Sequence, residues 1–128
     1  MTDRRRVSSG SPFEPTIGFS RAVRVGDHVW VSGTGPVWPD GSCPDDPTVQ
    51  TRRCFDIIIA AMSHAGATVE NVVRTRMYVT SVDDAAAVSA VHGEIFGHVL
   101  PAATMVVVAG LLDPRWKVEI EAEAVVLP

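Results

Sequence analysis

The sequence predicts an α+β domain in which two helices cover one face of a mixed sheet, in the order ββαβαββ. Segments with alternating apolar residues flank two segments in which apolar residues recur at the helical period. Turn-forming Gly, Pro and Asp separate these segments. The length of 128 residues, with 46% hydrophobic and 20% charged residues, fits one domain around a single core.

The N-terminal region predicts a mobile tail over residues 1–15. It carries three arginines, three serines and two prolines among few apolar residues. We therefore expect the single folded domain to span residues 16–128.

Residues 19–25 and 28–32 predict a β-hairpin around a two-residue turn that begins at Gly26. Pairing across this turn places Val23 opposite Trp30 on one face, and the other face of the hairpin is partly apolar as well. Because one helix layer covers only one face of a sheet, the second face predicts contact with another subunit.

A long loop over residues 33–46 precedes the first helix. Asp46 fits the N-cap and Pro47 the first helical position, and Gly66 fits the position just after the helix, which ends at about Ala65. The buried stripe of this helix comprises Phe55, Ile58, Ile59, Met62 and Ala65.

The second half of the chain predicts a strand over residues 72–80, a helix to about Gly97 and two further strands. Ser81 to Asp84 resembles a capping box, and Pro101 ends this helix. The apolar strand 103–108 fits a central position in the sheet. The last strand, 117–126, alternates most cleanly. The stripe of the second helix comprises Ala85, Val88, His92, Ile95 and Val99.

Three glutamates, Glu119, Glu121 and Glu123, share one face of the last strand. Like charges in such a row repel unless they are solvated or paired. Arg74 and Arg76 form a matching basic row, so a cross-strand ladder with Glu121 and Glu123 is one interpretation. The functional interpretation is that Glu119 faces a pocket and orients a water molecule.

Several functional classes lack their motifs. The sequence has no glycine-rich phosphate loop, no paired metal ligands and no hydrolase triad, so we expect no metal or other cofactor. A net charge of −4 and 6% aromatic residues make nucleic-acid binding and ribonuclease activity unlikely. The longest uncharged apolar stretch, 100–112, is shorter than the roughly 20 residues that span a bilayer, and no secretion signal precedes the domain. A cytoplasmic protein without membrane contact is the expectation, with Cys43 and Cys54 as reduced thiols.

The chain resembles the RidA/YjgF family, which is also known as L-PSP endoribonuclease. Residues 25–34 resemble the family segment in which Gly-Asp precedes an apolar run and Ser-Gly. Residues 65–75 resemble the segment that begins Ala-Gly and ends in Val-Val-Lys-Thr. Residues 101–104 and 118–122 resemble its C-terminal block, and the elements occur in the family's order over about residues 16–126.

The resemblance implies a chorismate-mutase-like fold, a homotrimer and ligand sites in the clefts between subunits. It also implies hydrolysis of reactive 2-imino acids. The resemblance further implies that Glu119 orients the attacking water. The other positions that match substrate-binding residues of the family are Ser32, Gly33, Phe19 or Ser20, Ser89, Ala103 and Thr104.

Ala103 stands where family deaminases carry the arginine that holds the substrate carboxylate. We therefore expect weak activity on 2-imino acids, and Arg21 and Arg115 are the candidates for an alternative guanidinium. Two hypotheses follow. The first is a hydrolase of an imine or enamine C=N bond, and the second is a trimer that binds a small metabolite without turning it over.

Overall fold

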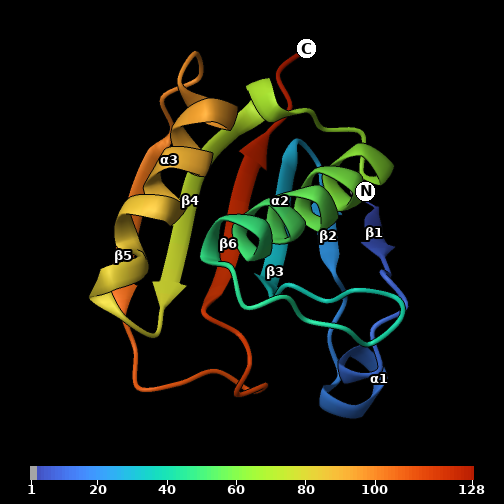
Figure 1. Cartoon of the computed structure of the whole chain (residues 1–128). Coiled ribbons are helices and arrows are strands. Elements are labelled where there is room, and N and C mark those ends of the chain that lie inside the picture. Colours follow the sequence, from blue (N-terminus) through green and yellow to red (C-terminus); the bar gives the residue numbers. More distant parts are fainter. Residues whose placement is uncertain (1–2) are drawn as a thin grey trace.

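The computed structural model describes residues 3–128 as one six-stranded sheet with two long helices on one face (Figure 1). This confirms the predicted α+β class, and the strand order is β1-β2-β3-β6-β4-β5. The strands are β1 (Arg4–Val7), β2 (Ala22–Val25), β3 (His28–Thr34), β4 (Val72–Val79), β5 (Ala102–Val107) and β6 (Val118–Val125). The helices are α1 (Phe13–Ile17), α2 (Pro47–His64) and α3 (Ala85–Phe96), and short 3₁₀ turns precede β4 and α3 (Val69–Asn71 and Val82–Asp84).

Neighbouring strands run antiparallel except for β4 and β5, which are parallel. The hairpin of β2 and β3 has the predicted register, with Val23 opposite Trp30. A register shift interrupts the pairing of β3 with β6 between Val31 and Thr34. This irregularity includes Ser32 and Gly33, two of the positions predicted for the site.

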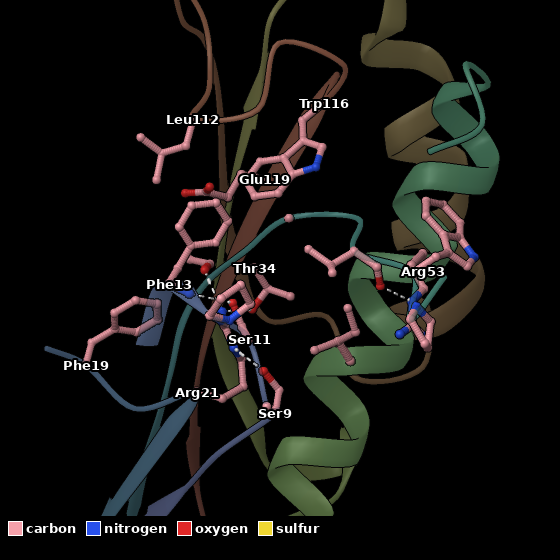
Figure 2. Close-up of a pocket in the computed structure, with 18 of the residues that line it drawn as sticks. Ser9, Ser11, Phe13, Phe19, Arg21, Thr34, Arg53, Leu112, Trp116 and Glu119 are labelled. Carbon is pink, nitrogen blue, oxygen red and sulfur yellow. Dashed lines mark hydrogen bonds between the residues drawn. The ribbon is translucent and has the colours of Figure 1, made fainter. Parts of the chain in front are cut away.

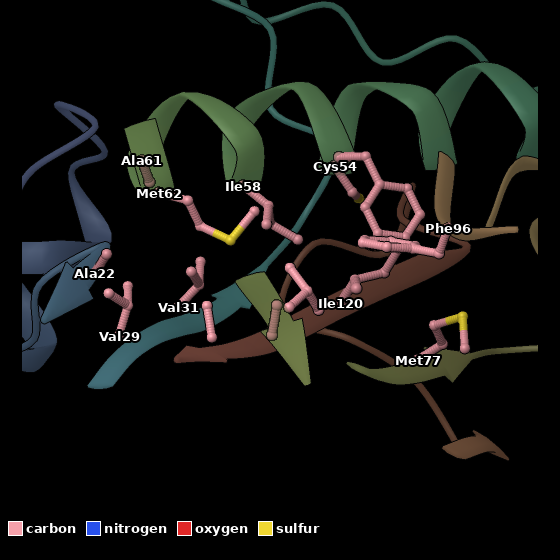
Figure 3. Packing of buried hydrophobic residues seen from close by; sticks show 14 of the residues in the cluster. Ala22, Val29, Val31, Cys54, Ile58, Ala61, Met62, Met77, Phe96 and Ile120 are labelled. Atoms are coloured by element: carbon pink, nitrogen blue, oxygen red, sulfur yellow. The ribbon is translucent and has the colours of Figure 1, made fainter. Parts of the chain in front are cut away.

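The core lies between the sheet and the two helices, where α2 crosses above β3 and β6 (Figure 3). The Asp46 side chain accepts hydrogen bonds from the backbone amides of Thr48 and Val49, which confirms the predicted N-cap. Gly66 has a φ of 83°, as expected just past a helix end. His92 of α3 lies beside Phe55 and Phe96 and forms a 2.8 Å hydrogen bond with the Thr75 hydroxyl.

The expectation of a mobile tail over residues 1–15 is wrong for most of that segment, although Met1 and Thr2 lie outside the described residues. β1 pairs with β2 at the sheet edge, and α1 begins at Phe13. Arg5 donates to the His64 carbonyl at 2.7 Å, at the end of α2, where the helix dipole favours a cation. Backbone pairing, this charge interaction and the packing of Val7 against the core order the segment, although its composition is mostly polar.

The expectation of a central position for strand 103–108 is also wrong, because β5 lies at the edge of the sheet and, within residues 3–128, pairs only with β4. Val106 is 42% exposed and Val107 is 56% exposed. An apolar edge strand is exposed to pairing with another chain. The apolar residues of β5 therefore lie at the surface of the single chain and not in its core.

Candidate functional site

A cavity of about 510 Å³ opens where the N-terminal segment, the end of β3, the loop before α2 and the start of β6 meet. Figure 2 shows that Ser9, Phe13 and Arg21 reach it from one direction and Arg53 of α2 from another. Gly33 near the end of β3 and Gly35 just after it line the cavity with backbone atoms alone. The cavity size suits a small organic molecule.

Glu119 of β6 places its carboxylate against the backbone of Gly33. A Cβ atom at Gly33 would lie only 2.6 Å from the Glu119 Oε2 atom, so glycine is what permits this approach. Among residues 3–128 no group hydrogen-bonds the Glu119 carboxylate. Burial raises the pKa of Glu119, Glu121 adds to the rise, and Arg21 opposes it. A partly buried carboxylate without such a partner is suited to accept a proton.

Arg21 lies in the same cavity and is buried. Its Nη1 donates to the Gly33 carbonyl at 2.7 Å and to the Thr34 hydroxyl at 3.1 Å. Its Nε lies 3.8 Å from the carboxylate of Glu14, which is also buried. Burial lowers the pKa of Arg21, and the charges of Glu14 and Glu119 oppose the change. The guanidinium thus fixes the backbone at Gly33.

Glu14 is held in place by Ser9. The Ser9 backbone amide and hydroxyl both donate to Glu14 Oε2, at 3.1 Å and 2.5 Å. Burial acts to raise the pKa of Glu14, but hydrogen bonds from Ser9 and Ser8 and the charge of Arg21 outweigh it, and the pKa is lowered. Glu14 is therefore ionised at neutral pH and neutralises Arg21.

Aromatic side chains form the apolar wall near Glu119. Phe13 and Trp116 pack edge to face with ring centroids 6.0 Å apart, and Leu112 and Phe19 complete this part of the lining (Figure 2). A Cβ atom at Gly35 would lie 2.6 Å from the Trp116 ring, so this glycine lets the indole pack on the backbone. The wall gives the region next to the carboxylate an apolar lining.

The remaining glutamates of β6 have partners. Arg76 lies 3.4 Å from Glu121 and 2.8 Å from Glu123, and the Tyr78 hydroxyl donates to Glu121 at 3.0 Å. This confirms the cross-strand ladder for Arg76. Arg74 instead donates to the Thr104 hydroxyl.

The structure brings together three of the residues predicted for the site, namely Phe19, Gly33 and Glu119. Ser32 and Ser20 lie beside the cavity, where the Ser32 hydroxyl donates to the Ser20 carbonyl at 2.6 Å.

The other predicted positions lie elsewhere in the chain. Ser89 is exposed on α3, and Ala103 and Thr104 lie on β5, which β4 separates from β6. Within one chain these three residues do not line the cavity, so their role in a cleft between subunits stays a prediction.

Sequence reasoning missed Glu14, Phe13, Leu112 and Trp116. Their segments lack a motif, and only the folded chain brings residues 13 and 116 together. The two candidate arginines are now distinguished. Arg115 is exposed, pairs with Asp113 at 2.8 Å and is absent from the lining of the cavity, whereas Arg21 lines it.

Across residues 3–128 no group of three or more His, Cys, Asp or Glu residues is arranged to hold a metal ion. Over the same residues no helix has the length and apolar character needed to cross a membrane.

Residues 10–126 match the sequence profile of the family described as Endoribonuclease L-PSP. The chain belongs to this family. The Endoribonuclease L-PSP match includes the glutamate row and every lining residue of the cavity except Ser9, and the resemblance to RidA/YjgF proteins noted from the motifs is thereby confirmed.

Solved structures and curated relatives agree with the family assignment. A Mycobacterium tuberculosis structure described as a member of the YjgF/YER057c/UK114 family has a TM-score of 0.89 and 45% identity, covering 97% of this chain and 100% of that one. The 2-iminobutanoate/2-iminopropanoate deaminase of Escherichia coli is 35% identical over 84% of this chain and 86% of its own. A structure of Escherichia coli TdcF with bound serine has a TM-score of 0.79 and 29% identity, covering 94% and 93%.

Proposed function

We propose that the protein hydrolyses the C=N bond of a small imine or enamine. The reaction is R₂C=NH₂⁺ + H₂O → R₂C=O + NH₄⁺. Glu119 accepts a proton from the attacking water and returns it to the departing nitrogen. The similarity to an enzyme named as an imino-acid deaminase supports this reaction type.

The observation that carries the proposal is the environment of Glu119. Its carboxylate is partly buried, lacks a hydrogen-bond partner among residues 3–128 and lines a cavity large enough for a small molecule. A raised pKa brings a carboxylate closer to the operating pH of a general base. The Gly33 backbone stands next to it, so water and substrate meet a fixed polar surface.

The proposed substrate needs no carboxylate next to its imine carbon. Ala103 cannot supply the guanidinium that matching family members use, and the charge of Arg21 is already neutralised by Glu14. Loss of a buried charged contact costs about 2–5 kcal/mol. We therefore expect hydrolysis of 2-iminobutanoate and similar compounds to be weak, by roughly 30-fold to several thousand-fold relative to arginine-containing relatives.

The proposal includes a homotrimer of cytoplasmic chains with ligands in clefts between subunits. The exposed apolar edge strand β5 and the half-exposed Trp30 on the open face of the sheet support contact between copies. Light scattering in dilute solution should give three times the mass of the chain. A monomer mass would contradict this part of the proposal.

The alternative is a trimer that binds a metabolite without turnover. The structure of Escherichia coli TdcF, a protein of the same fold, contains bound serine, and this supports the alternative.

Ammonia release separates the two functions. Imines are generated in situ, with an amine oxidase for substrates without a carboxylate and an amino-acid oxidase for 2-imino acids. We expect the protein to accelerate ammonia release from the first group and to have a smaller effect on the second. Saturable ligand binding without any acceleration would favour the binding trimer.

A further inference from the structure

We infer that the cavity has two oppositely charged ends and takes an elongated ligand whose cationic nitrogen and anionic group are separated by an apolar spacer. Arg53 of α2 holds the anionic group, and Glu119 faces the nitrogen. The part of this inference that concerns a substrate rests on the proposed function. The binding preference itself does not require turnover.

Two arginines line the cavity, and they differ in their partners. Arg21 is buried with the carboxylate of Glu14 at 3.8 Å and bonds to Gly33 and Thr34. Its charge and most of its donors are used within the chain, so it is not the anion site.

Arg53 is the other arginine of the lining. Its Nε donates to the Val37 carbonyl at 2.6 Å, which anchors the side chain, and within residues 3–128 it forms no ion pair. The rest of its guanidinium keeps its charge and its donors for a ligand. Arg53 is therefore the cavity cation that fits an anionic group.

Glu119 and Arg53 come from opposite sides of the sheet. Val118 and Ile120 of β6 belong to the core beneath α2, so Glu119 between them projects to the other face, whereas Arg53 belongs to α2 itself. Figure 2 shows the two side chains on different sides of the cavity.

Much of the remaining lining is apolar. The lining includes Phe13, Val37, Trp38 and Trp116, and Gly33 near the end of β3 and Gly35 just after it contribute no side chains. Such a surface favours an aromatic or branched aliphatic spacer. An aromatic wall beside Glu119 also favours an iminium or ammonium cation.

The resulting ligand class differs from α-imino acids, in which the carboxylate is attached to the imine carbon. Here the anionic group is remote from the nitrogen. Arg53 is thus a specificity-determining residue, since it selects the far end of the ligand and does not touch the reacting bond.

Four unreactive compounds of similar size test the inference by calorimetric titration: 4-(aminomethyl)benzoate, benzylamine, benzoate and benzyl alcohol. We expect 4-(aminomethyl)benzoate to bind best, benzylamine to bind more weakly and benzoate to bind poorly. Arg53→Gln should lower the affinity for 4-(aminomethyl)benzoate by about tenfold, because it loses one charge-assisted contact, and should leave benzylamine unchanged.

Arg52→Gln is the matched control. Arg52 is the preceding residue of α2, is exposed and pairs with Glu94 at 2.8 Å, so this variant should bind all four compounds like the parent. Arg53→Lys should retain most of the affinity that Arg53→Gln loses. Glu119→Gln should weaken both amines but not benzyl alcohol.

The inference is overturned if none of the four compounds binds, if benzoate binds as well as 4-(aminomethyl)benzoate, or if Arg53→Gln leaves the latter's affinity unchanged. A failure of the proposed function would give a different result. In that case 4-(aminomethyl)benzoate would bind through Arg53, but the protein would not accelerate ammonia release from any imine.

Discussion

Two ends of one row of glutamates behave differently in this protein. Glu119 and Glu121 project from the same face of β6, two positions apart. Glu121 accepts hydrogen bonds from Arg76 and from the Tyr78 hydroxyl. Glu119 has no such partner among residues 3–128 and approaches the backbone of Gly33 instead.

The difference comes from the neighbouring strands. β4 supplies a cation and a phenol to the Glu121 end, and Tyr78, which lies opposite Glu119 in the ladder, directs its hydroxyl to Glu121. At the other end β3 supplies a glycine and a register shift. Identical side chains on one strand therefore become a structural ion pair and a candidate proton acceptor, according to the strand beside them.

The largest expected effect distinguishes the two ends by activity. Glu119→Gln removes the group that takes the proton, so hydrolysis of a carboxylate-free imine should fall by roughly 10²–10⁴-fold. Glu121→Gln keeps the Tyr78 hydrogen bond and should change the rate little. Initial rates of ammonia release check both variants. Equal losses of activity in the two variants would show that the reaction does not take place at Glu119 beside Gly33.

The next effect concerns Ala103 and depends on the trimer. Ala103→Arg restores the guanidinium at the position that resembles the carboxylate clamp of the family, and hydrolysis of 2-imino acids should rise by roughly 30- to 150-fold. Ala103 is exposed in the single chain, so the larger side chain does not enter the core.

The matched control is the double variant Ala103→Arg with Glu119→Gln, which should lose the gain. A thermal melt and light scattering accompany the assay. A folded trimer with arginine at position 103 and no gain would show that Ala103 does not share a cleft with Glu119.

Two glycines at the Gly33 end provide a smaller contrast. A Cβ atom at Gly33 meets the flexible end of Glu119, so Gly33→Ala should lower activity by about tenfold through displacement of the carboxylate, with little change in melting temperature. A Cβ atom at Gly35 meets the rigid Trp116 ring at 2.6 Å. Gly35→Ala should therefore reduce the free energy of unfolding by about 1–3 kcal/mol. Denaturant titration and kinetics on both variants separate the effects, and the reverse pattern would contradict the assignment.

The smallest effect is on the pH dependence of stability. Because the pKa of Glu119 is raised in the folded state, ionisation at neutral pH costs stability, and this cost disappears below the unfolded pKa, near the ordinary glutamate value of 4.5. Glu119→Gln should therefore increase the free energy of unfolding at neutral pH and leave it unchanged at acidic pH. Glu121→Gln removes the charge that faces Arg76 and should not be stabilising. Urea titrations at the two pH values measure this, and a destabilised Glu119→Gln variant at neutral pH would contradict the burial argument.

The activity profile should follow the same pKa. As the pH falls, hydrolysis should decline through the raised pKa of Glu119, above the pH at which an ordinary glutamate becomes protonated. Rates measured across the acidic range check this limb of the profile.

The local pattern of the chain was sufficient to predict most elements and part of the site. The hairpin register, the Asp46 cap and the alternation of β6 are set by interactions within a few residues, so the sequence predicts them well. Glu119 and Gly33 were found because their motifs lie on these regular elements.

The sequence by itself determined the α+β class and the face on which Glu119 lies, because periodicity and turn chemistry are local properties, and its motifs indicated the family by resemblance. Only the tertiary structure decided that β1 and α1 are ordered, that β5 is an edge strand, and that Arg21 is neutralised by Glu14 whereas Arg53 is not. Each of these depends on pairing between distant segments, where hydrogen bonds and charges select partners that composition does not encode. The cavity is the clearest case, since its lining comes from residues 9 to 119 and exists only after those segments have packed.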